Sequence, residues 1–309
     1  MLIFRTEGSP QVGWHRLDRS LYLATLLKPE VDILFCVNKD KPSIERLQKR
    51  KFDFCLTTAL SGLKKKDIKA VLFDLGHFAP EDGELLAWAR QRDIKTLQLS
   101  QPEGPNQAAL FVIDALVDPA YAVLHHKFRH FNRIRRKYRK KIKNVFLNLG
   151  DTVDYRNLRG VVDRLSRFRL NLKVAPGFLI KKANKKALKR IYPAVSFVGQ
   201  CESLARAYFE ADVAVIASED ALYEAAAVGT PALYLCYDRM TEAVADSFEE
   251  RGAGLKITNL REVLKAGIIE KLDRLTLEAR IRMGAAGKNL VDARGVYRII
   301  DFLKKNVII

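Results

Sequence analysis

The sequence predicts an α/β protein built from two doubly wound domains that face each other across a cleft. The chain has 309 residues, which is close to the size of two domains of about 150 residues each. Short apolar runs alternate with amphipathic stretches along its whole length, which is the pattern of βαβ units in parallel sheets. After a strongly basic stretch, this rhythm restarts at residue 144. Two Rossmann-like domains, joined by a basic segment, are therefore expected.

The first domain is expected to span residues 1–126. A Gly/Pro loop follows its first strand and leads into a helix from about Arg16 to Leu27. The strands expected in this domain are Leu2–Arg5, Asp32–Val37, Ala70–Asp74, Thr96–Leu99 and Leu110–Asp114.

The second domain is expected to span residues 144–309. Its first strand ends just before Gly150, and helices are expected between the strands that follow. These strands are Asn144–Asn148, Leu172–Ala175, Val195–Val198, Val213–Ile216 and Ala232–Leu235.

The segment Lys127–Lys143 carries much of the formal net charge of +18. Apolar residues recur in it at spacings of three or four, which predicts a helix with an apolar stripe and a basic remainder. A solvated interdomain helix is the favoured interpretation, and contact with an anionic membrane surface or an acidic protein is the alternative. Nucleic acid is not expected as a partner, since the sequence holds no zinc-finger, RRM or KH signature. The stripe residues are Phe128, Phe131, Ile134, Tyr138 and Ile142.

Composition excludes some classes of protein. With 48% hydrophobic and 29% charged residues, the chain is not a mainly disordered protein. It has no apolar run of 18 residues and its first residues lack a signal-peptide pattern, so we expect a cytoplasmic protein, with attachment to the inner membrane face left open. We expect no cofactor and no structural metal, and buried free thiols at the four scattered cysteines, Cys36, Cys55, Cys201 and Cys236.

The ligand position follows from this topology. In open α/β sheets, ligands bind outside the carboxyl ends of the strands, where helix N-termini offer unpaired N–H groups. Three loops are expected to line the site: Glu7–Arg16, Leu149–Tyr155 and Ala217–Glu224.

Four blocks of residues resemble one family. The segment SPQVGWHRLDRSLYLA, with Ser9, Pro10, Gly13, Arg19 and Leu21–Ala24, is similar to the N-terminal motif of the nucleotide-sugar hydrolases of pseudaminic acid biosynthesis, which have the glycosyltransferase B fold. Asp118–Phe128 resembles the interdomain segment of that family, and Leu290–Arg298 resembles its C-terminal signature. Glu224–Pro231 resembles a helix-turn shared with the wider glycosyltransferase B group.

The resemblance implies a UDP-sugar hydrolase that acts on a UDP-2,4-diacetamido-trideoxy-hexose in bacterial surface-glycan biosynthesis. A glycosyltransferase B-type transferase, or an accessory relative that binds without turnover, are the alternatives. In the family, a histidine of the first loop activates water, and glycine-rich loops let the pyrophosphate approach the backbone. In register with that motif, Arg16 occupies the histidine position and His15 stands one residue earlier.

The candidate catalytic residues are His15, as the general base, and Asp74, a carboxylate that ends an apolar strand. An exposed or structural histidine and an ordinary loop-facing carboxylate are the alternatives. Arg16 and Arg19 are expected to hold the diphosphate. The full set of expected substrate-binding residues is Gly13, Arg16, Arg19, Gly150, Thr152, Ser218, Glu224, Met240 and Thr241.

The second-domain loops differ from the family pattern. Gly150-Asp151 and Ser218-Glu219-Asp220 stand where the relatives carry Gly-Gly pairs, and Met240-Thr241 replaces an Asn-Gln pair. The carboxylates would repel a diphosphate, or they could simply cap a helix N-terminus. Glu224 matches the glutamate that binds ribose hydroxyls in related sugar-nucleotide enzymes, and an ordinary first-turn glutamate is its alternative.

Overall fold

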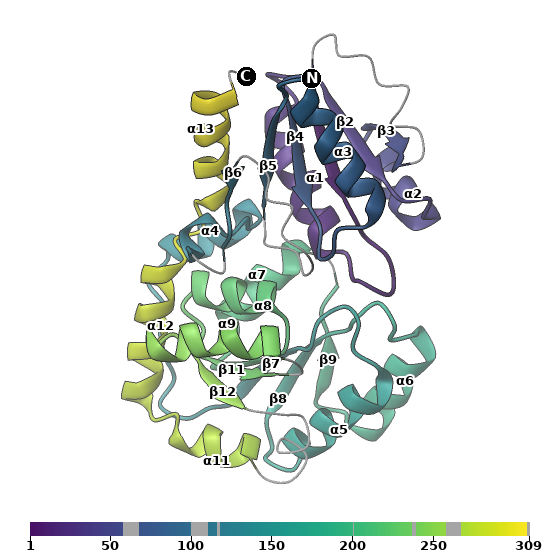
Figure 1. Ribbon diagram of the computed structural model, residues 1–309. Coiled ribbons are helices and arrows are strands. Elements are labelled where there is room, and N and C mark those ends of the chain that lie inside the picture. The colour runs from purple at the N-terminus through teal and green to yellow at the C-terminus, as the bar shows by residue number, and fades with distance from the viewer. Residues whose placement is uncertain are drawn as a thin grey trace. The chain divides into compact units, whose positions relative to one another are not determined.

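The computed structural model describes residues 1–57, 68–99, 111–115, 118–199, 201–236, 239–257 and 267–307. The chain forms two compact units (Figure 1). Unit 1 contains Met1–Val123 together with Arg294–Ile309, and unit 2 contains Leu124–Ala293. In the described part of the chain, no helix is both long and apolar enough to cross a bilayer.

Unit 1 is built on a parallel sheet of six strands in the order β3-β2-β1-β4-β5-β6. The strands are β1 (Leu2–Thr6), β2 (Ile33–Val37), β3 (Asp53–Leu56), β4 (Ala70–Asp74), β5 (Lys95–Gln98) and β6 (Phe111–Val112). The helices are α1 (His15–Leu27), α2 (Lys41–Lys49), α3 (Pro80–Gln91), the 3-10 turn η2 (Pro119–Tyr121) and α13 (Gly295–Val307). Buried side chains of α1, α2 and α13 form one core cluster with β1, and those of α3 form another, so the helices lie on both faces.

Unit 2 repeats this plan in the order β12-β11-β10-β7-β8-β9. Its strands are β7 (Asn144–Asn148), β8 (Asn171–Ala175), β9 (Val195–Phe197), β10 (Val213–Ile216), β11 (Ala232–Leu235) and β12 (Leu255–Ile257). Its helices are α4 (His126–Arg133), α5 (Tyr155–Ser166), α6 (Lys182–Ile191), α7 (Cys201–Glu210), α8 (Glu219–Ala227), α9 (Arg239–Glu250), α11 (Gly267–Arg274) and α12 (Leu277–Leu290).

These elements confirm the expected fold class of two Rossmann-like parallel sheets. Each sheet has the doubly wound strand order 3-2-1-4-5-6. The central strands are apolar without alternation, as in β10 with the sequence VAVI, because helices bury both of their faces. The expected strand at Leu110–Asp114 is shorter, at Phe111–Val112, and its first residue lies outside the described residues.

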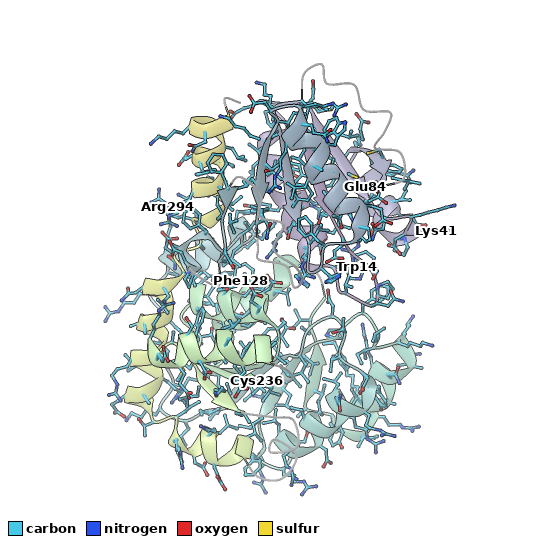
Figure 2. All side chains as sticks on the ribbon, in the orientation of Figure 1. Trp14, Lys41, Glu84, Phe128, Cys236 and Arg294 are labelled. Atoms are coloured by element: carbon cyan, nitrogen blue, oxygen red, sulfur yellow. The ribbon has the colours of Figure 1, made fainter. Side chains whose placement is uncertain are left out.

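The expected basic helix over 127–143 is wrong beyond its first turns. The helix α4 ends at Arg133, and Ile134 has the extended backbone angles φ −81 and ψ 133. Phe128, labelled in Figure 2, is 1% exposed and packs with its ring 6.2 Å from that of Tyr208. The predicted helical apolar stripe is therefore present only in α4. Residues 134–143 instead form an extended segment on unit 2, which we call the strap.

The strap is not helical because its side chains bind carbonyl groups of unit 2. Arg136 donates to the carbonyl oxygen of Ala211 and, at 2.9 Å, to the hydroxyl of Thr230. The Tyr138 hydroxyl donates to the Gly229 carbonyl at 2.9 Å. Carbonyls at helix ends lack intrahelical partners, and a guanidinium supplies several donors to them. A continuous helix would also place many like charges one turn apart, which is unfavourable.

The strap has an inner and an outer row, because extended backbone directs successive side chains to opposite sides. Arg136 and Tyr138 are partly buried, whereas their neighbours Arg135 and Lys137 are exposed. Asp212, at 2% exposure, accepts from Arg139 at 3.0 Å and from the backbone N–H of Asn144 at 2.9 Å, which fixes the end of the strap beside β7.

The C-terminal boundary also differs from the expected 144–309. Helix α13 belongs to unit 1, where it packs against η2 and α1. Gly295 permits this contact, since a Cβ there would lie 2.3 Å from the Ala122 carbonyl oxygen. Arg298 then donates to the Ala120 carbonyl at 2.8 Å. The chain thus returns to the first sheet, which no local sequence pattern indicates.

We predict that Arg136→Met lowers the free energy of unfolding by about 2 kcal/mol or more, because it leaves helix-end carbonyls without donors. Burial lowers the pKa of Arg136 to about 10, so the side chain still carries its charge at neutral pH. Arg135→Met is the matched control, with the same loss of charge at an exposed position, and should change stability by less than about 0.5 kcal/mol. Urea unfolding measures both, and equal effects would contradict this role of Arg136.

Candidate functional site

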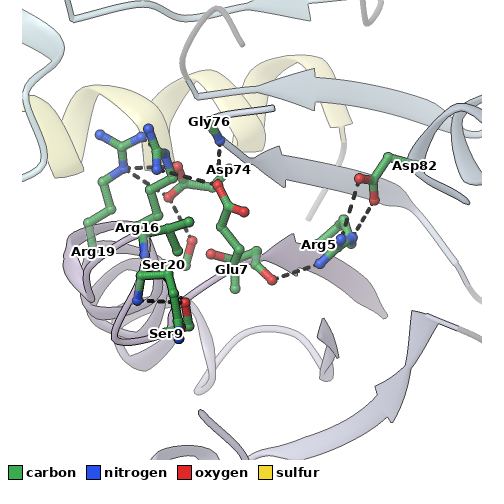
Figure 3. Close-up of polar contacts among 12 residues, drawn as sticks. Arg5, Glu7, Ser9, Arg16, Arg19, Ser20, Asp74, Gly76 and Asp82 are labelled. Carbon is green, nitrogen blue, oxygen red and sulfur yellow. Dashed lines mark hydrogen bonds and ion pairs between the residues drawn. The ribbon is translucent and has the colours of Figure 1, made fainter. Parts of the chain in front are cut away.

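In unit 1, the first candidate site lies at the carboxyl ends of β1 and β4, which are neighbours in the sheet. Glu7 follows β1, and Gly76 lies two residues after β4. The Glu7 carboxylate accepts from the backbone N–H of Gly76 at 2.6 Å and from Arg16 at 3.3 Å (Figure 3). A Cβ on Gly76 would lie 2.6 Å from the Arg16 guanidinium carbon, so a side chain at this position would displace the Arg16 guanidinium.

Asp74 is bonded on both carboxylate oxygens. It is 1% exposed and accepts from Arg19 Nε at 2.8 and 3.0 Å and from the Ser20 hydroxyl at 2.9 Å (Figure 3). Both oxygens of this carboxylate are therefore already occupied by donors from Arg19 and Ser20. Asp74 therefore fits a role in orienting Arg19 better than the expected catalytic role.

His15 is the first residue of α1, one turn before Arg19, and is partly buried. The loop before it is a tight turn, in which the backbones of Ser9 and Gly13 bond each other at 2.9 and 3.1 Å. Gly13 has φ +81, which a glycine adopts without strain. The structure brings Arg16 rather than His15 to Glu7, so the one-residue offset in the sequence corresponds to a different direction on the helix.

A cavity of about 100 Å³ lies beside this site, between the loops that follow β1 and β2. Asp40 in its wall accepts from the backbone N–H of Ser43 at 2.9 Å and so caps α2. The cavity is lined by Glu7, Gly8, Ser9, Val12, Val37, Asn38, Asp40 and Ser43.

In unit 2, the second candidate site lies where β7 and β10 are neighbours. Gly150, with φ +84, follows β7, and a Cβ on it would lie 3.3 Å from the Cβ of Ser218, which follows β10. Gly177, after β8, approaches the same loop: a Cβ there would lie 2.6 Å from the Gly150 carbonyl oxygen and 2.9 Å from that of Asp151. Three loops therefore meet at this point, which we call the unit 2 crevice.

The N-terminus of α8 opens into this crevice. Ser218 is the N-cap residue by its extended backbone, yet its side chain makes no capping hydrogen bond. Ser218 therefore does not cap α8 through its side chain. Glu219 and Asp220 occupy the first turn, where carboxylates interact favourably with the helix dipole.

A buried polar network adjoins the crevice. The Asn148 side-chain amide donates to the Tyr208 hydroxyl at 2.9 Å, and Tyr208 donates to the Glu224 carboxylate. Burial, and then the charge of Asp220, raise the pKa of Glu224 to about 8, although the hydrogen bond from Tyr208 opposes this. Glu224 is thus a largely neutral carboxylic acid at pH 7, able to donate as well as accept a hydrogen bond.

The remaining expected residues are placed as follows. Thr152 is exposed in the loop after β7. Thr241 lies in the first turn of α9, where its carbonyl accepts from the Cys236 thiol at 3.7 Å. The side chain of Met240 lies outside the described residues. Sequence reasoning missed Gly177 and Tyr208: a glycine after the second strand of the domain was a usable signal for the first, whereas no local signal marks the second.

Comparison with known proteins supports the fold. No family model matches the chain. The spore coat polysaccharide biosynthesis protein SpsG of Bacillus subtilis (strain 168) is 22% identical over 96% of each chain. MurG of Acinetobacter baumannii aligns with a TM-score of 0.64 at 14% identity over 98% of this chain and 99% of its own. Anabaena Alr3699/HepE, solved in complex with UDP and glucose, aligns with a TM-score of 0.58 at 12% identity over 99% of each chain.

These likenesses confirm a glycosyltransferase B-type fold, and they do not favour the hydrolases over the transferases. Among the described residues, no group of three or more histidine, cysteine, aspartate or glutamate side chains is placed to hold a metal ion.

We predict a pH-dependent stability difference between the wild type and Glu224→Gln. The folded-state pKa of Glu224, about 8, lies above the ordinary value of 4.5, so its contribution to stability is fully present below pH 4.5 and is lost as the pH rises to about 8. In that window, the wild type should lose up to about 1.4 kcal/mol per pH unit relative to the variant. Urea unfolding at pH 5 and pH 8 measures this.

Glu250→Gln, at an exposed position at the end of α9, is the control. If the free energy of unfolding of the wild type differs from that of Glu224→Gln by the same amount at both pH values, Glu224 is ionised in the folded protein.

Proposed function

We propose that the chain binds a nucleotide-sugar at the unit 2 crevice and transfers its sugar to an acceptor. The observation that carries this proposal is the meeting of the Gly150, Gly177 and Ser218 loops at the α8 N-terminus, beside Glu224. Glycines without side chains let a diphosphate approach backbone N–H groups, and a helix N-terminus attracts its charge. HepE, which shares the fold, was solved with UDP and glucose, so UDP is the nucleotide that we propose.

Each candidate residue is assigned a role in binding the nucleotide-sugar according to its chemistry. Glu224, neutral near pH 7, can donate to one ribose hydroxyl and accept from the other. Gly150, Thr152 and Ser218 are assigned to the diphosphate in unit 2, and Arg16 and Arg19 are the candidate phosphate-binding cations of unit 1. Asp74 holds Arg19 through its bonds to Nε. Thr241, in the first turn of α9, is assigned to the sugar side of the nucleotide.

Hydrolysis is the second candidate, and the similarity of the Ser9–Ala24 segment to nucleotide-sugar hydrolases favours it. In that case, His15 at the start of α1 would be the general base. Release of UDP from UDP-sugars in water alone supports hydrolysis. Release only with an added sugar or glycan acceptor supports transfer. Binding without release under either condition supports an accessory protein that has lost turnover.

We predict that Gly177→Ala weakens UDP binding by at least about tenfold, since the added Cβ pushes the Gly150–Asp151 backbone out of place. Gly199→Ala is the matched control: it follows β9, and a Cβ there meets nothing within 4 Å. Isothermal titration calorimetry measures both variants. A wild type with no affinity for UDP, or equal weakening by both substitutions, would contradict the proposed site.

The exposed row of the strap is proposed as a contact for an anionic surface. Its cations are Arg135, Lys137, Lys140, Lys141 and Lys143. We predict adsorption to phosphatidylglycerol vesicles at low salt that disappears at high salt, because contacts between exposed charges are screened. Combining Arg135→Gln, Lys137→Gln and Lys140→Gln should reduce adsorption at low salt, whereas the anchoring Arg136 is kept. If the wild type does not adsorb to the vesicles at low salt, a membrane is excluded as the partner.

A further inference from the structure

Two cysteines of unit 1 lie side by side on neighbouring strands. Cys36 of β2 and Cys55 of β3 are paired in register in the parallel ladder. Adjacent strands are about 4.8 Å apart, and side chains of paired residues point to the same face. Both cysteines belong to the apolar cluster beneath α3, Cys36 in its core and Cys55 at its margin. The two thiols are close enough to hydrogen-bond each other.

A buried cation lies next to this cysteine pair in the sheet. Arg5 of β1 is in register with Cys36, so Arg5, Cys36 and Cys55 follow one another across three strands. Arg5 is 2% exposed and forms an ion pair with Asp82 of α3 (Figure 3). It also donates to Asn38 at 2.9 Å, in the wall of the unit 1 cavity. Arg5 is therefore fixed in place, and its charge acts on the neighbouring sulfurs.

The two thiols differ in accessibility and in acidity. Cys36 is fully buried, whereas Cys55 lies on the edge strand and is partly exposed. A hydrogen bond donated by Cys36 lowers the pKa of the Cys55 thiol, and the charge of Arg5 lowers it further. The same hydrogen bond, with burial, raises the pKa of Cys36. Cys55 is the better nucleophile of the pair, and Cys36 holds the proton.

We propose that Cys36 and Cys55 form an oxidisable thiol pair, in which the Cys55 thiolate reacts with a small peroxide and Cys36 then forms the disulfide with it. The Cys55 thiolate attacks one peroxide oxygen; the O–O bond breaks, an S–O bond forms, and the other oxygen leaves as water after taking a proton. The Cys36 sulfur then attacks the Cys55 sulfur, the S–O bond breaks, and the hydroxyl leaves as water with the Cys36 proton. Two thiols are oxidised to one disulfide and the peroxide is reduced to two waters.

The in-register position supports bridge formation. The strand spacing falls within the Cα separation of about 4.4–6.8 Å that disulfides span. Because Cys55 is partly exposed, dithiols would be able to reduce the bridge again. It would lie one residue from Val37 and two from Asn38, both in the wall of the unit 1 cavity.

The test uses the full-length protein in native buffer with a small excess of hydrogen peroxide. Non-reducing peptide mapping should show one Cys36–Cys55 disulfide, formed at least about ten times as fast as any oxidation of Cys236, and reversed by dithiothreitol. In Cys36→Ser, the reaction should stop at a sulfenic acid on Cys55 that dimedone labels. Cys55→Ser should abolish the bridge, and Cys236→Ser, the control at another buried thiol, should leave it unchanged.

The wild-type protein decides the question even if a serine variant fails to fold. A bridge that forms only in denaturant, thiols of Cys36 and Cys55 that stay reduced while Cys236 oxidises, or dimedone labelling elsewhere than Cys55 would each overturn the proposal. Those outcomes would make the pair ordinary core cysteines.

Discussion

The reversal of strand order in each sheet is the constraint on which the rest depends. The chain winds outward from β7 to β9, then returns to the other side of β7 and continues from β10 to β12. The loops that leave β7 and β10 must therefore diverge to opposite faces, which opens a crevice at their carboxyl ends. Gly150, Ser218 and the α8 N-terminus lie there because of the topology, with glycine needed where backbones approach closely. The same reversal at β1 and β4 places Glu7, Arg16 and Asp74 together.

Some of the basic side chains of this protein stabilise the fold as well as contribute to the positive surface potential. Arg136 and Arg139 use their positive charge on carbonyl groups and on the buried carboxylate of Asp212. Arg280, 1% exposed, likewise donates to the carbonyls of Arg139 and Lys140. A segment that is strongly basic in sequence thus divides into anchoring and exposed rows, and only the exposed row can meet an anionic partner.

Much of the fold was predictable from the sequence. Apolar runs such as those of β4 and β10 identify strands buried on both faces, and their alternation with amphipathic stretches identifies parallel sheets. The helix expected over 127–143 fails because periodicity alone does not show that Arg136 binds carbonyls distant in sequence. The return of α13 to unit 1 depends on the contact between Gly295 and Ala122, which is likewise non-local.

The positions of those site residues that follow from the strand order were predictable from the sequence. Gly150 and Ser218 lie in the unit 2 crevice because each follows a central strand, and Glu224 lies beside it within α8, the helix that begins there. The partners of individual side chains were not predictable: Asp74 binds Arg19, and Tyr208 supports Glu224 from a different helix. The choice between hydrolysis and transfer depends on the position of a base relative to a bound sugar, which strand order does not determine.

Hydrogen–deuterium exchange with and without UDP tests the central claim most directly, because it reports which loops a nucleotide covers. Slower exchange is expected in 149–155, 176–181 and 218–224, with α6 and α11 unchanged. Protection confined to other segments, or no protection at saturating UDP, would contradict the assignment of nucleotide binding to the crevice between β7 and β10.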